Sequence, residues 1–162
     1  MFCVGDYVVH PMHGAGVISD IVHERINGTI REYYVFEMPV SGLLLKIPVS
    51  NSPAIGIRAV VGRAEAEALL RAIPALVVKE PSNWNHRYRE NMERLKSGDL
   101  YEVARVIKGL MQRESAHRLS TGERKMLHSA KQILISEIVL TEGCAYQEVE
   151  DRINHAMTTE EP

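Results

Sequence analysis

The chain has 162 residues, of which 45% are apolar and 25% charged, and its formal net charge is −2. This length suffices for one ordinary domain or two small ones, and the composition of a soluble globular protein argues against a largely disordered chain. No segment approaches membrane-spanning length, and the N-terminus lacks the basic stretch and apolar run of a signal peptide, so we expect a cytoplasmic protein. The two cysteines, Cys3 and Cys144, form no CxxC pair, so we expect reduced thiols and no metal site.

Up to about residue 60, the chain contains short runs rich in β-branched and aromatic residues, which predict strands. The runs cover residues 7–9, 16–18, 33–36 and 43–47. Asn27-Gly28 favours a tight hairpin, because both residues tolerate the positive φ that such a turn needs. About five strands in fewer than 60 residues fit a small, strongly bent SH3-like or Tudor-like β-barrel better than a sandwich. We predict this barrel over residues 1–57.

After residue 60 the pattern becomes helical. Residues 63–71 consist of good helix formers and stop near Pro74. A second helix is expected from Ser82 or Asn83 to Ser97, with Gly98 as its stop. Asp99 is expected to cap a third helix, which carries an apolar stripe at helical spacing from Leu100 to Met111.

The C-terminal part of the chain predicts further helices. Ser120-Thr121-Gly122-Glu123 is a capping box, in which the serine accepts from the amide three residues on while the glutamate reaches back. The helix that it opens is expected to end at Gly143, and a last helix covers about residues 145–157. Four or five short helices therefore form an all-α domain over residues 58–162. The fold class is α+β with two domains.

The charge distribution along the chain is uneven. Residues 79–128 carry eleven Lys/Arg against seven Asp/Glu, a net charge of +4, whereas residues 129–162 carry two against seven, a net charge of −5. A bounded basic surface in an acidic protein indicates limited contact with nucleic acid, because phosphate neutralisation depends on the charges that reach the backbone. Solvated helix faces are the alternative, since the seven acids are interspersed.

The single tryptophan, Trp84, lies among basic and hydrogen-bonding residues in the segment 81–89, where a helix begins. A ring displayed at a basic surface would serve as an apolar wedge in a nucleic-acid contact, with arginines as phosphate clamps. A half-buried tryptophan that fastens a helix N-terminus to its neighbour is the alternative. This segment alone leaves both interpretations open.

Catalytic patterns are scarce. A proline separates His10 from His13, which prevents helical ligand geometry and clean strand alternation, and no carboxylate motif completes a metal site. Residues 14–16, Gly-Ala-Gly, lack the further features of a phosphate loop and fit a bend in a barrel strand better. We therefore expect neither an enzyme nor a cofactor.

Six motif blocks follow one another along the chain: residues 4–18, 45–48, 56–58, 80–88, 95–99 and 119–127. In this order they resemble the CarD/CdnL family of bacterial transcription regulators. The first block alone is similar also to the polymerase-binding module of transcription-repair coupling factors. The tryptophan block and the Ser-x-Gly-Glu block single out CarD.

The resemblance implies a function for each domain. The Tudor-like domain would bind the RNA polymerase β subunit, largely by strand pairing. The helical domain would contact promoter DNA at the upstream edge of the bubble, where the tryptophan acts as a minor-groove wedge and stabilises the open complex. Carried over by position, the DNA-contacting residues are Trp84, Asn83, His86, Arg87 and Arg89, with Arg113, Arg124 and Lys125 as further basic candidates.

On the polymerase side, the resemblance assigns a basic contact to Lys46, which precedes Ile47-Pro48, and an apolar contact to Ile26. Arg25 and Pro48 complete this set. The chain departs from the family pattern at Glu24, where another basic contact is expected, so the role of the adjacent Arg25 depends on the register of the hairpin. We expect a monomer.

Two other functions compete with this reading. A methyl-lysine reader could use an aromatic cage made from Tyr7, Tyr33, Tyr34 and Phe36, although alternate strand residues face opposite sides and divide such a set between core and surface. A metal-dependent hydrolase would use His10, His13 and His23.

Overall fold

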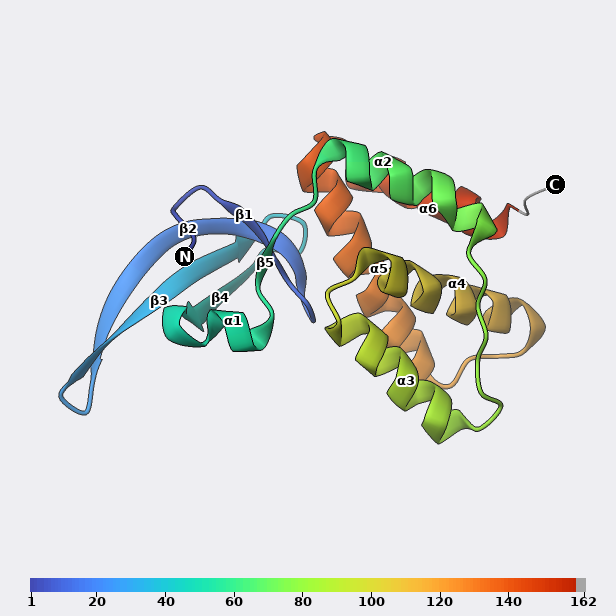
Figure 1. The fold of residues 1–162 in the computed structure, drawn as a ribbon, viewed down its shortest axis with the longest axis horizontal. Coiled ribbons are helices and arrows are strands. Elements are labelled where there is room, and N and C mark those ends of the chain that lie inside the picture. The colour runs from blue at the N-terminus through green and yellow to red at the C-terminus, as the bar shows by residue number, and fades with distance from the viewer. Residues whose placement is uncertain (160–162) are drawn as a thin grey trace.

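The computed structural model describes residues 1–159 and shows a curved sheet beside a group of helices (Figure 1). The strands are β1 (Tyr7–His10), β2 (Gly14–Ile26), β3 (Thr29–Met38), β4 (Leu43–Pro48) and β5 (Arg58–Ala59). They form one antiparallel sheet in the order β4-β3-β2-β1-β5, and the short helices η1 (Val49–Asn51) and α1 (Ser52–Ile55) connect β4 to β5. The predicted α+β class is confirmed. β5 extends the sheet two residues beyond the expected domain boundary at residue 57.

The curved sheet packs around a small apolar core. Its buried members are Val8, Ile18, Tyr34, Phe36, Met38, Ile47 and Ile57. A register shift between Ile18 and Asp20 bends β2, and a Cβ at Gly16 would lie 2.7 Å from the Phe36 ring, so the strand passes directly over that ring. The Asn27-Gly28 turn is confirmed by positive φ at both residues.

The aromatic side chains of the sheet do not gather into a cage. Tyr34 and Phe36 are buried in the core, whereas Tyr7 is half exposed on β1. This division between core and surface was expected from strand alternation, and it leaves Tyr34 and Phe36 unavailable for a methyl-lysine cage.

The helices agree closely with the sequence prediction. They are α2 (Arg63–Ala72), η2 (Ile73–Ala75), α3 (Trp84–Lys96), α4 (Leu100–Ala116), α5 (Thr121–Glu142) and α6 (Tyr146–Thr158). Asn83, Asp99 and Ser120 each cap a helix by accepting a backbone N–H, and Gly143 ends α5 with a positive φ. No helix within residues 1–159 is long and apolar enough to span a membrane.

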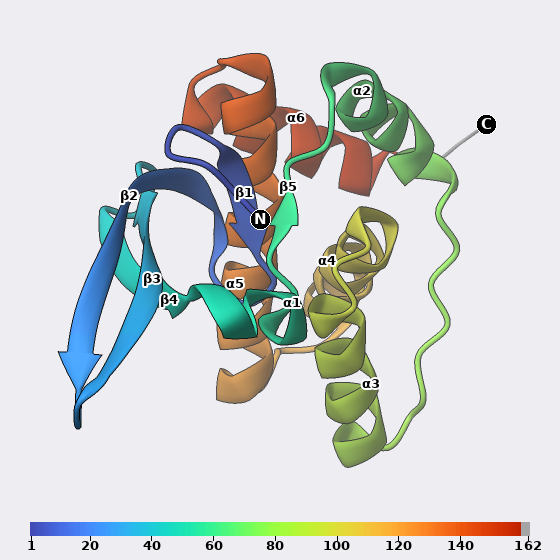
Figure 2. The ribbon, with the colours of Figure 1, turned by 60° about the vertical axis from the view of Figure 1, so that its left-hand side comes forward.

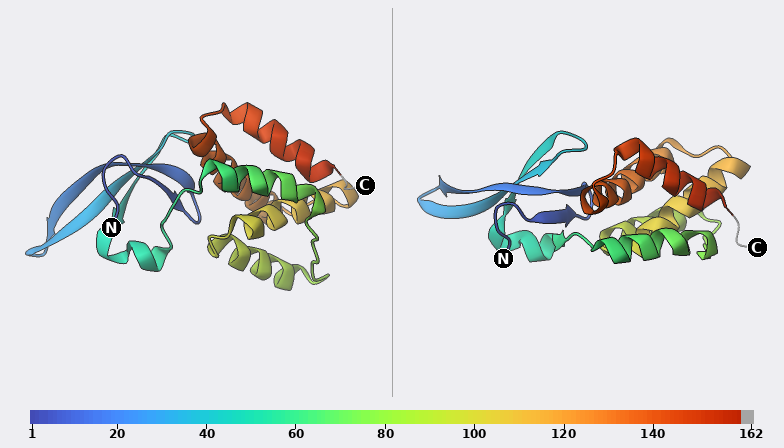
Figure 3. Two further views of the ribbon diagram at one scale, coloured as in Figure 1. Left: turned by 45° about the horizontal axis from the view of Figure 1, so that its top comes forward. Right: turned by 90° about the horizontal axis from the view of Figure 1, so that it is seen from above.

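α5 is the central element of the helical domain. Ile133, Leu134 and Ile138 are fully or almost fully buried in one core with residues of α2, α4 and α6. Figure 2 shows α5 running behind β1 and β5, so the same helix also meets the sheet. The two views of Figure 3 show the sheet and the helices as neighbouring parts of an elongated molecule.

The segment of residues 76–83, which leads into α3, is fixed to α4. The buried ammonium of Lys108 donates hydrogen bonds to the carbonyls of Ile73, Pro74 and Leu76, over 2.7 to 2.9 Å. A Cβ at Gly109 would lie 2.5 Å from a carboxylate oxygen of Glu80, so the chain packs directly on α4 there. These contacts set where α3 begins, and Trp84 is its first residue.

Candidate nucleic-acid and partner interfaces

Trp84 is held in one orientation while much of its ring stays accessible. The residue is 42% exposed. Its ring stacks on Tyr88, with centroids 5.0 Å apart and planes inclined by 19°. The indole N–H lies 3.1 Å from both Ser120 Oγ and Glu123 Oε1, at the start of α5. The structure therefore unites both interpretations, because the ring fastens α3 to α5 and also presents an apolar surface to solvent.

Arg87 lies in the interior, which corrects its assignment to the DNA-contacting set. It is 1% exposed, and its Nε donates to Glu123 Oε2 over 3.0 Å. Its Nη1 donates to the carbonyls of Pro81 and Ser82, at 3.4 and 3.2 Å. The guanidinium groups of buried arginines are retained by such partners, and this one has no access to a phosphate in this conformation. Arg87 supports the segment beneath Trp84 instead.

Glu123 joins these contacts, and only half of the predicted capping box is present. The Ser120 hydroxyl accepts the Glu123 amide over 3.2 Å, as expected, but the carboxylate turns to Arg87 and the indole. Burial would raise the pKa of this carboxyl, yet the hydrogen bond and charge of Arg87, together with Ser120 and Arg113, outweigh it and lower the pKa. Glu123 is therefore a buried carboxylate that orients the tryptophan.

The remaining basic candidates, which we call the basic rim, are exposed side chains on α3 and on the first turns of α5. Arg89, Arg124 and Lys125 are exposed, and none makes a salt bridge with another described residue. Arg124 and Lys125 line an open hollow on the first turns of α5, together with Thr121, His128 and Ser129. A helix N-terminus favours anions, so this rim suits phosphate.

The other three predicted DNA-contacting residues reach solvent but lie near partners within the chain. Asn83 is exposed, but its side-chain oxygen is engaged by the His86 amide. The exposed His86 ring lies 3.9 Å from the Glu90 carboxylate. Arg113 is partly exposed, and its Nε is 3.8 Å from Glu123.

β4 forms one edge of the sheet, and it carries Lys46 and Pro48 of the predicted polymerase contacts. Lys46 is exposed there and pairs with Glu24 of β2, while Pro48 ends the strand. Ile26 is also exposed, at the tip of the β2–β3 hairpin. Arg25 lies opposite Ile30 in the backbone register of the hairpin. Because neighbouring residues of a strand face opposite sides, Arg25 lies on the face of the sheet opposite to Glu24 and Lys46.

Two sequence models match this chain, and together they cover both parts of the fold. Residues 2–61 match the CarD-like/TRCF RID domain, and residues 68–154 match the CarD C-terminal domain. The chain belongs to the CarD family. It is 31% identical over 149 residues to the proposed transcription factor YdeB of Bacillus subtilis (strain 168), which covers 92% of this chain and 97% of that protein.

CarD membership gives the chain a role in transcription regulation, in a family of transcription factors rather than enzymes. The RID domain implies an interaction with RNA polymerase. The first matched range ends at residue 61, after β5, and the second begins at residue 68, within α2.

The histidines of this CarD protein do not assemble into a ligand set. The rings of His10 and His13 lie 4.5 Å apart, and burial together with the neighbouring His13 lowers the pKa of His10 to about 4. His23 lies on the hairpin, 3.0 Å from Glu32. Among residues 1–159, no three side chains of metal-binding types lie close enough to share a metal ion.

Sequence reasoning missed Tyr88 and Glu123 as functional residues of the CarD helical domain. Tyr88 sits one helical turn after Trp84, and this spacing is a signal for a stacked pair on one helix face. Glu123 could be predicted only as a capping residue, because its role depends on how α3 packs on α5.

Proposed function

We propose that this CarD protein binds the RNA polymerase β subunit through the β4 edge and stabilises the promoter open complex through the surface around Trp84. That surface would contact DNA at the upstream edge of the bubble, without strong sequence specificity. The observation that supports this best is an accessible indole, fixed by Tyr88, Ser120 and Glu123 on the same two helices that carry the basic rim. The protein would act as a cytoplasmic monomer at polymerase.

A preoriented ring suits the role of a wedge. The stack on Tyr88 and the hydrogen bonds of the indole N–H order the side chain before DNA arrives, so little conformational entropy remains to be lost on binding. A wedge favours melted DNA only by its differential affinity for that state. Base stacking on an aromatic ring contributes about 1 to 3 kcal/mol, which would prolong the open complex roughly tenfold to a hundredfold.

The basic rim would add affinity that does not depend on sequence. Within residues 1–159, Arg89, Arg124 and Lys125 have no salt-bridge partner, so each can neutralise a phosphate and release a counterion. Such a small rim on an acidic protein binds DNA weakly, and binding to polymerase would supply the local concentration that the rim needs.

The β4 edge suits strand addition. β4 pairs only with β3 in this sheet, so its outer N–H and C=O groups are open to a partner strand. Lys46 would exchange its exposed partner Glu24 for an acidic group of the polymerase. A surface ion pair contributes little free energy, so this exchange costs little.

The test is a pair of measurements on the full chain. Co-purification of RNA polymerase with the tagged protein tests partner binding, with Lys46→Glu as the variant expected to lose it. The lifetime of the open complex after competitor challenge, with and without the protein, tests the promoter role. Absence of polymerase from the purified sample, or an unchanged lifetime, would refute the corresponding half of the proposal.

A further inference from the structure

The connection between the sheet and the helices is not a free linker, because the backbone groups of its consecutive residues are hydrogen-bonded to the elements on both sides. The Val60 amide donates to the Tyr7 carbonyl of β1 over 3.3 Å. The next amide, that of Val61, donates to Glu137 of α5 over 2.8 Å, and the Val61 carbonyl accepts from Thr141 over 2.9 Å. The segment is thus attached to the sheet on one side and to α5 on the other.

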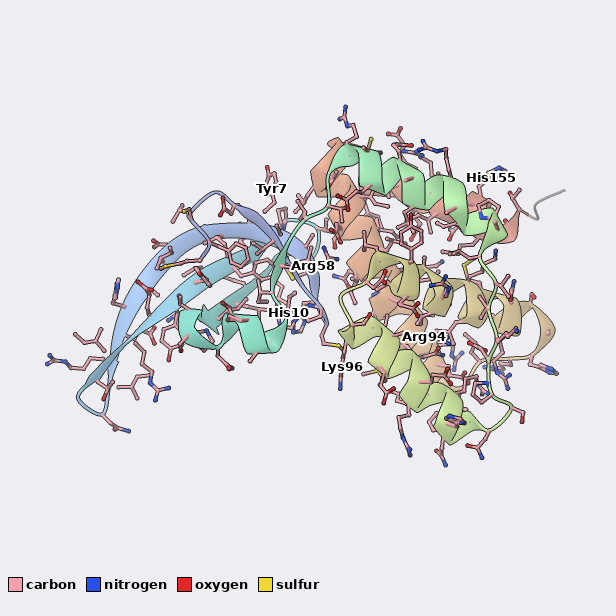
Figure 4. The ribbon with its side chains drawn as sticks, in the orientation of Figure 1. Tyr7, His10, Arg58, Arg94, Lys96 and His155 are labelled. Atoms are coloured by element: carbon pink, nitrogen blue, oxygen red, sulfur yellow. The ribbon has the colours of Figure 1, made fainter. Side chains whose placement is uncertain are left out.

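An ion pair between a partly exposed arginine and a buried glutamate spans the same junction. Glu137 of α5 is fully buried, and the Arg58 guanidinium of β5 donates to both of its oxygens, over 2.7 and 2.8 Å. Figure 4 shows Arg58 at the junction of the two parts. A bidentate arginine–carboxylate pair fixes direction as well as distance, because both groups are planar.

A second contact approaches α5 from the start of β2. The buried Ala15 amide donates to the buried Ser136 hydroxyl over 2.9 Å. A Cβ at Gly14 would lie 2.6 Å from Ser136 Oγ and 3.3 Å from Ile133 Cα, so only glycine allows the backbone to come this close. Gly14 also has a φ of +107°, which side chains disfavour.

α5 links this junction to the tryptophan. Its residues 133–137 meet the sheet, whereas Ser120 and Glu123 hold the Trp84 indole at its other end. Fourteen residues separate Glu137 from Glu123, and a helix rises about 1.5 Å per residue, so about 21 Å of continuous helix joins the two sites.

We propose that the joint, defined as Arg58, Glu137, Ser136 and Gly14, is a rigid coupling that sets where Trp84 lies relative to the β4 edge. Arg58 and Glu137 are then positioning residues for open-complex stabilisation. The inference rests on the proposed function. A flexible tether would only raise the local concentration of the wedge, whereas a rigid coupling also aims it at one place on the DNA once polymerase is bound.

The matched variants of the full chain are Arg58→Met, which breaks the joint, and Arg152→Met, which breaks ion pairs with Glu67 and Glu142 inside the helical domain. A double variant, Arg58→Met with Glu137→Leu, removes the buried charge altogether and guards against misfolding of the single variant. All three are compared with wild type after their folding has been checked by circular dichroism.

The first measurement is the distance distribution between two spin labels, one in each domain. Cys3 of the sheet part is exposed and serves as one site, and Glu148→Cys on α6, in a Cys144→Ser background, serves as the other. We expect one narrow distribution for the reference protein and for Arg152→Met, and a broad one for both joint variants. A narrow, unshifted distribution in the joint variants would overturn the coupling.

The second measurement is open-complex lifetime beside polymerase affinity. The joint variants should keep polymerase affinity within about twofold and lose about tenfold in lifetime stimulation, because the wedge no longer has a fixed position. Full stimulation by a joint variant with a broad distribution would overturn the positioning role. If wild type leaves the lifetime unchanged, the proposed function and the positioning role both fail, while the distance distributions still decide whether the joint is rigid.

Discussion

Arg87 and Arg89 lie two residues apart on α3 and should behave in opposite ways when each is replaced by methionine. Arg87 is buried on Glu123, whereas Arg89 is exposed and has no salt-bridge partner among the described residues. Methionine keeps most of the aliphatic length and removes the charge. The pair therefore separates a structural arginine from a phosphate-contacting one on a single helix.

The Arg87→Met variant should lose substantial stability. Breaking a buried ion pair by removing one partner costs about 3 to 5 kcal/mol. We expect the lower end, about 3 kcal/mol, because Glu123 keeps its hydrogen bonds to the indole and to Ser120 and its neighbour Arg113. For a chain of this length that corresponds to a fall of about 6 to 12 °C in Tm. Arg89→Met should stay within about 0.5 kcal/mol of wild type.

The loss of stability in Arg87→Met should also depend on pH. The pKa of Glu123 is lowered below its ordinary value of 4.5 in the folded chain, so this carboxylate contributes stability above that pH and loses the contribution as pH falls through the folded-state pKa. Without Arg87, the strongest influence that lowers this pKa is lost, and burial, which raises it, is opposed by Ser120 and Arg113 alone among these causes. The stability difference between wild type and variant should therefore be largest near neutral pH and shrink as the pH falls below 4.5.

The assays are denaturant unfolding from pH 3 to 7 and a salt titration of open-complex stabilisation. Arg89→Met should lower the salt slope by about one unit, whereas Arg87→Met should leave it unchanged wherever the variant is folded. A wild-type Tm for Arg87→Met together with a reduced salt slope would show that this guanidinium reaches phosphate, and the buried arrangement would be refuted.

Three further predictions concern the exposed surfaces. Trp84→Ala should abolish most open-complex stabilisation and cost about 2 kcal/mol in unfolding experiments, whereas Trp84→Phe should keep the stack on Tyr88 and lose less activity; equal stimulation by all three proteins would contradict a wedge. Lys46→Glu places a second acid beside Glu24 and should abolish polymerase co-purification without lowering Tm; retained polymerase would exclude the β4 contact. Arg124→Glu and Lys125→Glu should each weaken promoter engagement equally across promoter sequences, and a sequence-selective loss would instead indicate base readout.

The helices, their caps and the β2–β3 turn could be predicted because their signals are local. Asn83, Asp99 and Ser120 cap the helices through amides two or three residues away, and Asn27-Gly28 needs only its own backbone conformation. The same local reasoning placed Trp84 at the start of a helix. It also placed Lys46 on a strand, which the structure shows to be an edge.

The burial of Arg87 and the direction of Glu123 could not be predicted in this way, because they depend on contacts between residues 36 apart. One signal was present. Arg87, Asn91 and Leu95 recur at intervals of four and form the buried stripe of α3, so the phase of Leu95 indicated which face turns inward. Arg58 and Glu137 are 79 residues apart, and nothing in the local pattern of either residue indicates the other.

The positions of the buried ion pairs support a division of labour between apolar and polar contacts. A buried arginine–carboxylate pair contributes little net stability compared with apolar residues of similar volume, because both charges must be desolvated. Each part of this chain already has its own apolar core. Yet Arg87–Glu123 lies beneath the indole, and Arg58–Glu137 lies where the sheet meets α5. Apolar packing tolerates small rotations that a bidentate pair resists. In the proposed function, both pairs lie where the orientation of Trp84 is set. A wedge delivered by a bound polymerase requires such a fixed orientation.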